Sequence, residues 1–166
     1  MIEKMTFMHV QEQLQNMKLK DIKTYMSIAK LVSERSYATR LKVGCVIEKG
    51  GSIISIGWNG MPAKYDNTCE HTDCNDCLVT NKEVQHAELN AIGKAAKSGI
   101  STENANLFIT HSPCMNCALL INVAGIKSVY FESLYRDSDG IDFLVKNGIN
   151  VFKVDVEKES VYAYTK

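Results

Sequence analysis

Two short motifs carry side chains that could do chemistry: His-Ala-Glu at residues 86–88 and Pro-Cys-Met-Asn-Cys at residues 113–117. His86, Cys114 and Cys117 offer three ligands for Zn²⁺. Three protein ligands leave the fourth tetrahedral position for water, which is typical of catalytic rather than closed structural sites. Zinc lowers the pKa of a bound water to roughly 7 and so supplies hydroxide at neutral pH. Glu88 is not needed as a ligand, and it is the candidate residue for moving protons beside the metal.

The spacing of these motifs predicts that two helix N-termini meet at the metal. Pro113 suits the first helical position, where its missing N–H would be unpaired anyway, and Cys114 and Cys117 then share one helix face. A helix N-terminus also favours the thiolate that zinc binds. His86 and Glu88 are two residues apart, so they converge on one metal only near a helix start. A lone Cys-x-x-Cys is often a structural zinc site or a redox pair, but the two motifs in this order favour catalytic zinc.

A second group of soft ligands lies in residues 63–85, the longest stretch without clear periodicity. Four donors fall within nine residues: Cys69, His71, Cys74 and Cys77. Their number and type fit a closed tetrahedral zinc site, which could stabilise a loop that has little core of its own. The alternative is a set of free thiols on a surface loop. The first interpretation predicts a second, structural zinc ion.

The remaining pattern predicts a three-layer α/β/α sandwich around a five-stranded mixed sheet. Apolar spacing indicates a helix over residues 19–34, and a Gly-Gly pair between two apolar runs suggests a hairpin. Alternating helices and strands then imply parallel strands with right-handed crossovers. The five expected strands cover residues 43–48, 52–57, 105–110, 127–132 and 150–154. We expect one catalytic domain over residues 19–166, preceded by an N-terminal extension, residues 1–18, whose structure the pattern leaves open.

Composition narrows the class of protein further. The 166-residue chain has 19 Lys+Arg and 19 Asp+Glu, a formal net charge of zero. Nucleic-acid binders usually carry a basic excess, so no nucleic-acid partner is expected. No apolar run approaches a membrane span, and the N-terminal region lacks the apolar core of a signal peptide. The six cysteines then indicate metal binding in a reducing compartment, which predicts a cytoplasmic protein without membrane contact.

The motifs also carry a family resemblance. His-x-Glu followed by Pro-Cys-x-x-Cys is the signature of zinc-dependent nucleobase deaminases. From about residue 20 to residue 155 the chain resembles the deoxycytidylate (dCMP) deaminases of the cytidine deaminase-like superfamily. The resemblance rests on residues 43–47, 57–62, 86–92, 112–117 and 124–127. The chain departs from the family at Trp58, where Tyr is common, and its cysteine loop is of a kind that varies between members.

This resemblance implies hydrolysis of dCMP to dUMP and ammonia, which feeds dTTP synthesis. It implies a homo-oligomer, often a hexamer. It also implies activation by dCTP and inhibition by dTTP, both with Mg²⁺, at a separate site near residues 59–61 that includes Asn59 and Gly60. Glu88 would take a proton from water and then protonate N3 and the leaving amine, serving in turn as base and acid.

The resemblance further implies the substrate contacts. The backbone N–H of Ala87 would hold the base carbonyl, the backbone carbonyl of Ser112 would accept from the amino group, and Asn59 would lie near sugar and base. Arg40 and Tyr135 match the phosphate contacts, and the planar fork of donors on arginine suits phosphate. The alternative for both is a solvated surface side chain.

Rival functions stay open at this point. The same zinc core would serve deamination of another cytosine or adenine substrate, such as dCTP, tRNA or single-stranded DNA. A polynucleotide deaminase should show basic and aromatic surface stretches, of which the balanced charge gives little sign. A zinc-binding scaffold without activity should lack the proton-moving carboxylate, which is present here as Glu88.

Overall fold

The computed structural model describes residues 17–164. Most of the predicted N-terminal extension, residues 1–16, lies outside this range. Among the described residues no helix is both long and apolar enough to cross a membrane. In chain order the elements are α2 (Leu19–Ser33), β1 (Gly44–Lys49), β2 (Ser52–Trp58), β3 (Glu70–Thr72), β4 (Leu78–Thr80), α3 (Ala87–Lys97), β5 (Asn106–His111), α4 (Met115–Val123), β6 (Ser128–Ser133), α5 (Asp139–Lys146), β7 (Asn150–Asp155) and β8 (Ser160–Tyr164).

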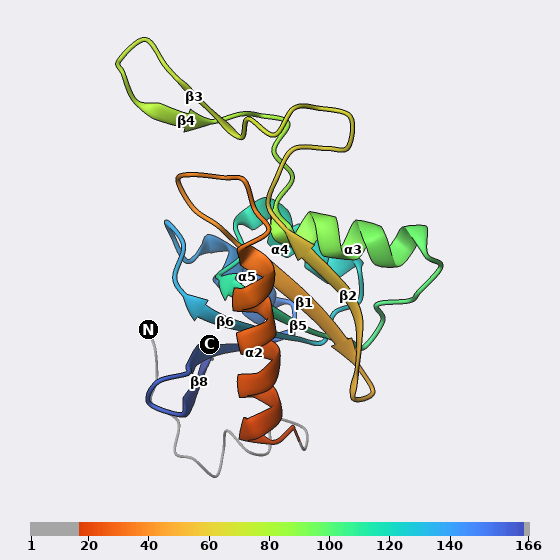
Figure 1. Cartoon of the computed structure of the whole chain (residues 1–166). Helices are drawn as coiled ribbons and strands as arrows, with labels where there is room; N and C mark the ends of the chain where they lie inside the picture. Colours follow the sequence, from red (N-terminus) through yellow and green to blue (C-terminus); the bar gives the residue numbers. More distant parts are fainter. Residues whose placement is uncertain (1–16, 165–166) are drawn as a thin grey trace.

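Six strands form one mixed sheet in the order β2-β1-β5-β6-β7-β8 (Figure 1). β1 is antiparallel to both of its neighbours, β5, β6 and β7 run parallel, and β8 returns antiparallel to β7. The predicted α/β class and mixed sheet are confirmed, but the count of five strands is wrong by one. The missed strand, β8, lies at the sheet edge, where only Ala163 is fully buried. A half-exposed edge strand lacks the continuous apolar run that marks the buried strands.

Helices cover both faces of the sheet, as the three-layer prediction requires. α3, α4 and α5 pack on one face, against side chains such as Ile47, Ile109 and Phe131. α2 packs on the other face, over Val46 and a row of stacked rings. In that row, Phe108 lies 4.6 Å from Tyr130, and Tyr130 lies 4.8 Å from Phe152, measured between ring centroids. Successive strand residues point to opposite faces, so the buried strands are apolar on both sides and form two cores.

Two glycines set the distance between the sheet, the helices and the chemical motifs. A Cβ atom on Gly57 in β2 would lie 2.3 Å from the carbonyl oxygen of Ala87. A Cβ atom on Gly140 in α5 would lie 2.2 Å from the carbonyl oxygen of Pro113. Both contacts are too close for any side chain. The absence of a side chain at these two glycines therefore lets α3 and the segment before α4 approach closely enough for the N-termini of α3 and α4 to converge.

The irregular stretch predicted for residues 63–85 contains a small hairpin of its own. β3 and β4 pair antiparallel as a separate two-stranded sheet, which extends away from the body of the domain (Figure 1). Asp73 stabilises the turn, because its carboxylate accepts hydrogen bonds from the backbone N–H groups of Asn75 and Cys77, both at 2.9 Å. At the other end of the hairpin, Glu70 pairs with Thr80.

Candidate active site

The first zinc motif and the second meet where two helices begin. His86 is the N-cap residue of α3, and Cys114 is the N-cap residue of α4. Nδ1 of His86 lies 3.6 Å from Sγ of Cys114 and 3.3 Å from Sγ of Cys117. Tetrahedral zinc with Zn–N of about 2.0–2.1 Å and Zn–S of about 2.3 Å separates such atoms by roughly 3.5 Å. The donor set therefore fits zinc. Pro113 differs from its expected place, since it precedes the cap instead of opening the helix.

Electrostatic coupling among these donors favours a thiolate. Hydrogen bonding with Cys117 and with His86 lowers the pKa of Cys114 far below that of a free thiol. The contact with Cys114 is also the main reason why the pKa of His86 is raised. Thiolates and neutral imidazole are the forms that bind zinc. The contact with Cys114, together with burial, raises the pKa of Cys117, so the two cysteines favour one thiolate between them, and zinc binding would displace the proton of the second thiol.

Glu88 lies in the first turn of α3 and is 4% exposed. Burial raises the pKa of this carboxyl group to about 7, and the neighbouring His86 opposes that shift only in part. A carboxyl group with a pKa close to neutrality can both accept and release a proton at physiological pH. Glu88 thus has the environment of an acid-base catalyst.

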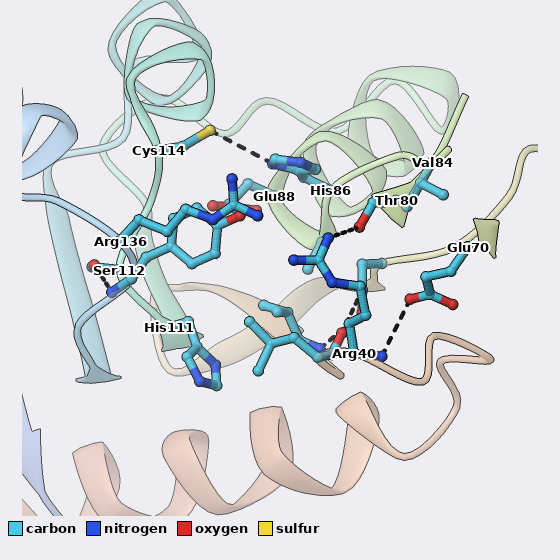
Figure 2. Close-up of a pocket in the computed structure, with 15 residues that line it drawn as sticks. Arg40, Glu70, Thr80, Val84, His86, Glu88, His111, Ser112, Cys114 and Arg136 are labelled. Atoms are coloured by element: carbon cyan, nitrogen blue, oxygen red, sulfur yellow. Dashed lines mark hydrogen bonds between the residues drawn. The ribbon is translucent and has the colours of Figure 1, made fainter. Parts of the chain in front are cut away.

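A cavity of about 290 Å³ opens over these groups (Figure 2). This volume is near the lower end of the range for small-molecule sites, roughly 300–1,000 Å³. All five residues for which substrate contacts were predicted line the cavity: Arg40, Asn59, Ala87, Ser112 and Tyr135. They come from segments that are up to 95 positions apart in the chain, between residues 40 and 135. The fold therefore gathers them around the zinc donors.

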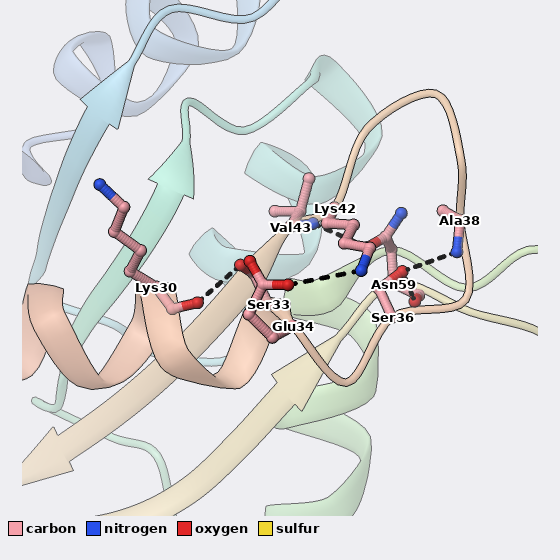
Figure 3. A network of polar contacts seen from close by, with 8 residues as sticks. All are labelled: Lys30, Ser33, Glu34, Ser36, Ala38, Lys42, Val43 and Asn59. Atoms are coloured by element: carbon pink, nitrogen blue, oxygen red, sulfur yellow. Dashed lines mark hydrogen bonds and ion pairs between the residues drawn. The ribbon is translucent and has the colours of Figure 1, made fainter.

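Asn59 also has a structural task. Its amide oxygen accepts a hydrogen bond from the backbone N–H of Val43 at 2.8 Å, and its amide nitrogen donates to the carbonyl of Leu41 at 2.8 Å. Its own carbonyl accepts from the hydroxyl of Ser36 at 2.7 Å (Figure 3). Asn59 thereby holds the segment before β1 in place along one wall of the cavity.

Ser112 holds the opposite wall. The residue is buried, and its hydroxyl oxygen accepts a hydrogen bond from the backbone N–H of Tyr135 at 2.8 Å. This bond fixes the start of the loop after β6. In the same loop, the guanidinium carbon of Arg136 lies 5.3 Å from the centroid of the Tyr135 ring. Arg40 and Arg136 lie on opposite sides of the cavity (Figure 2).

Sequence reasoning missed several residues of the cavity wall, chiefly Arg136, His111, Glu70 and Thr80. Arg136 and His111 had a usable signal, because ligands in α/β folds bind beyond the carboxyl ends of parallel strands. His111 ends β5, and Arg136 follows β6 closely. Glu70 and Thr80 gave no such signal, since they belong to the hairpin that the sequence did not predict.

The structure does not bring together the four donors of the cysteine loop. Within residues 17–164, His86, Cys114 and Cys117 are the one group of three or more such donors whose ligand atoms lie within 4.8 Å of one another. Pairing of β3 with β4 separates the others along the hairpin: Cys69 is buried before β3, His71 contacts Asn81 at 2.6 Å, and Cys74 and Cys77 are exposed near the turn. A second zinc site on these residues stays a prediction and would require the hairpin to rearrange.

Comparison with known proteins agrees with this geometry. The family described as the cytidine and deoxycytidylate deaminase zinc-binding region matches residues 19–133. The deoxycytidylate deaminase of Enterobacteria phage T4 is 38% identical over 170 aligned positions, covering 79% of this chain and 88% of the phage protein. The human deoxycytidylate deaminase is 36% identical over 124 positions, covering 69% of this chain and 66% of the human protein.

A solved structure extends the similarity to the fold. The dCMP deaminase of cyanophage S-TIM5, crystallised in complex with dCMP and dUMP, superposes with a TM-score of 0.79 at 44% identity. The match covers 84% of this chain and 100% of the cyanophage chain. The fold and the three donors thus define a zinc-dependent deaminase. More particularly, the chain belongs to the cytidine and deoxycytidylate deaminase family.

Proposed function

We propose that this chain catalyses the hydrolytic deamination of dCMP to dUMP and ammonia. One observation carries the proposal: a single cavity joins the zinc donors and buried Glu88 to two arginines, Arg40 and Arg136, on opposite sides. A cytosine base would occupy the zinc end, and a phosphate dianion would meet the arginines. The similarity to a cyanophage enzyme crystallised with dCMP and dUMP supports the same substrate.

The chain's own groups would perform the proton transfers. Zinc, when bound to His86, Cys114 and Cys117, lowers the pKa of water and so makes a nucleophile available at neutral pH. Glu88 accepts a proton from the water whose oxygen adds to C4 of cytosine, and passes a proton to N3. The second proton of that water goes through the same carboxyl group to the amino nitrogen. The bond between C4 and the amino nitrogen then breaks, and ammonia leaves. The N–H of Ala87 and the carbonyl of Ser112 would orient the base.

The experiment that tests this function compares four substrates on the purified zinc-loaded protein. We expect deamination of dCMP, with much lower kcat/KM for dCTP, for cytidine and for a short single-stranded oligonucleotide. Turnover would be followed by the absorbance change from cytosine to uracil. Preference for the oligonucleotide or for dCTP would replace the proposal with the corresponding alternative.

Replacing Arg40 should reveal the phosphate contact. A charge-assisted hydrogen bond to phosphate contributes roughly 1.5–3 kcal/mol, so Arg40→Ala should lower kcat/KM for dCMP by about tenfold to hundredfold. Deoxycytidine lacks the phosphate, so its low kcat/KM should hardly change. Measuring kcat/KM for dCMP and for deoxycytidine, on the wild type and on Arg40→Ala, shows whether the loss is confined to the substrate that carries the phosphate. Equal losses for the two substrates would mean that Arg40 acts through folding or assembly.

A second, more open cavity supports regulation by nucleotides near residues 59–61. Two cations lie close to the Trp58 ring, with the guanidinium carbon of Arg35 4.4 Å and Nζ of Lys94 3.9 Å from its centroid. Burial, and then the charge of Arg35, lower the pKa of Lys94. Two cations beside one aromatic ring favour an anion with a base to stack, as in dCTP or dTTP. Lys97 adds a further positive charge to the same cavity.

This cavity has a direct backbone connection to the zinc site. Gly60, on its wall, exchanges two hydrogen bonds with Gln85, at 3.0 and 2.9 Å, and Gln85 directly precedes His86. We therefore place activation by dCTP and inhibition by dTTP, each with Mg²⁺, at this cavity. Arg35→Ala should leave turnover without effector unchanged and abolish the response to dCTP and dTTP. An unchanged response would contradict the assignment.

The uncovered face of α4 supports a homo-oligomer, which we propose is a hexamer. Met115, Leu119 and Val123 follow one another at helical spacing and are 41%, 43% and 84% exposed. The helix carries no charged residue. An exposed row of large apolar side chains on one helix face is typical of an interaction surface, so a second copy would cover this face. Sedimentation velocity measures the assembly directly.

In the cell, the dUMP formed would supply dTTP synthesis.

A further inference from the structure

The hairpin of β3 and β4 forms part of the wall of the active-site cavity. Glu70 begins β3 and Thr80 ends β4, the two residues pair across the hairpin, and both line the cavity. The hairpin is not hydrogen-bonded into the six-stranded sheet. Its position relative to the cavity therefore depends on local contacts near these two residues.

Those contacts lead to the segment Thr39–Arg40. The carboxylate of Glu70 accepts hydrogen bonds from the backbone N–H of Thr39 at 3.2 Å, from its hydroxyl at 3.3 Å, and from the backbone N–H of Arg40 at 3.3 Å. From the other strand, the hydroxyl of Thr80 accepts from Nη1 of Arg40 at 3.0 Å (Figure 2). The hairpin thus holds both the backbone and the side chain of Arg40.

The geometry leaves the charge of Arg40 available. The guanidinium contacts a neutral hydroxyl, and none of the ion pairs found within residues 17–164 involves Arg40. The nearby carboxylate is instead occupied by successive backbone N–H groups, an arrangement in which main-chain donors stabilise an anion. Thr39 and Arg40 lie in no helix or strand. Ser36 and Asn59 hold the residues on either side of them, and Glu70 accepts from the backbone N–H groups of Thr39 and Arg40 themselves.

We propose that Glu70 is a positioning residue for the substrate phosphate. By holding the backbone of Thr39 and Arg40, it presents the Arg40 guanidinium to the cavity before the nucleotide arrives. Pre-organisation of this kind strengthens binding, because the arginine need not be ordered at the moment of association. The inference rests on the proposed role of Arg40 and names the residue that makes that role effective.

Two effects of Glu70 oppose each other, and their signs allow a test. As a carboxylate near the cavity, Glu70 repels a phosphate, so its removal alone would improve binding of dCMP. As a positioning residue, its removal frees Arg40 and weakens binding. We expect the second effect to prevail, so Glu70→Ala should raise KM for dCMP about tenfold with little change in kcat. Glu70→Gln keeps one oxygen acceptor and should show a smaller rise.

The test is a double-mutant cycle on the zinc-loaded full chain, with dCMP and deoxycytidine as substrates. Glu70→Ala should leave kcat/KM for deoxycytidine unchanged. The double variant with Arg40→Ala should be no worse on dCMP than Arg40→Ala alone, because Glu70 acts through Arg40. Glu83→Ala is the matched control: this exposed carboxylate follows the hairpin, and none of the hydrogen bonds found in the described chain involves its side chain.

The outcomes separate this inference from the function on which it rests. Independent, multiplied losses in the double variant would overturn the positioning role, as would equal losses on dCMP and deoxycytidine. A lower KM for dCMP in Glu70→Ala would show that repulsion prevails, and would also overturn it. If Arg40→Ala itself spares dCMP, the phosphate role of Arg40 is wrong, and the inference fails with it.

Discussion

Glu88→Gln should lower kcat for dCMP by about 10²- to 10⁴-fold while the zinc content stays at the wild-type value. The range is that of a positioned general acid-base group. Glutamine has nearly the same shape as glutamate, so the first turn of α3 should keep its geometry, but an amide cannot accept and return the proton. Single-turnover kinetics and metal analysis on the same preparation measure the two quantities.

The matched control is Glu83→Gln, which removes the same charge from an exposed position outside the cavity. It should leave both kcat and zinc content unchanged. Near wild-type turnover in Glu88→Gln would contradict the role of Glu88 in proton transfer. Loss of zinc together with turnover would instead indicate that Glu88 supports the metal, contrary to the arrangement in which the three donors are His86, Cys114 and Cys117.

Cys117→Ala should abolish deamination by removing the catalytic zinc, because the two donors that remain, His86 and Cys114, are too few to hold the ion in place. The tetrahedral site is built on one histidine and two cysteines, and within residues 17–164 no further donor belongs to that cluster and could replace a lost one. The variant should also melt at a lower temperature than the zinc-loaded wild type, since a bound metal stabilises the folded state by mass action. Zinc content by mass spectrometry and thermal denaturation check both expectations.

Cys45→Ala is the control for cysteine replacement in general. Cys45 is fully buried in the core beneath α3 and is not among the three clustered donors. Its replacement should retain zinc and activity. The same metal analysis decides the second metal: one zinc per chain in the wild type assigns it to the catalytic donors. Two zinc ions, reduced to one by replacing Cys74 and Cys77, would establish the structural site that the loop sequence predicted.

The clustering of the three metal donors, and the position of Glu88 at the same helix start, could be predicted because their geometry is local. Cys114 and Cys117 are separated by less than one helical turn, and His86 and Glu88 flank a helix start, so the backbone of each short motif already orients its side chains. The buried strands were visible for a similar reason. A strand covered on both faces is apolar throughout, whereas the edge strand β8 is half exposed and was missed.

Only the tertiary structure decided what surrounds that centre. Arg40 and Arg136 face one cavity because β1 begins on the side of the sheet where β6 ends, a fact that depends on strand order and direction. Glu70 and Thr80 reach the cavity because β3 pairs with β4, and the same pairing separates Cys69 from Cys74 and Cys77. The residue types and spacing of the cysteine loop resemble a zinc site, but hydrogen bonding between backbones determines where those thiols lie.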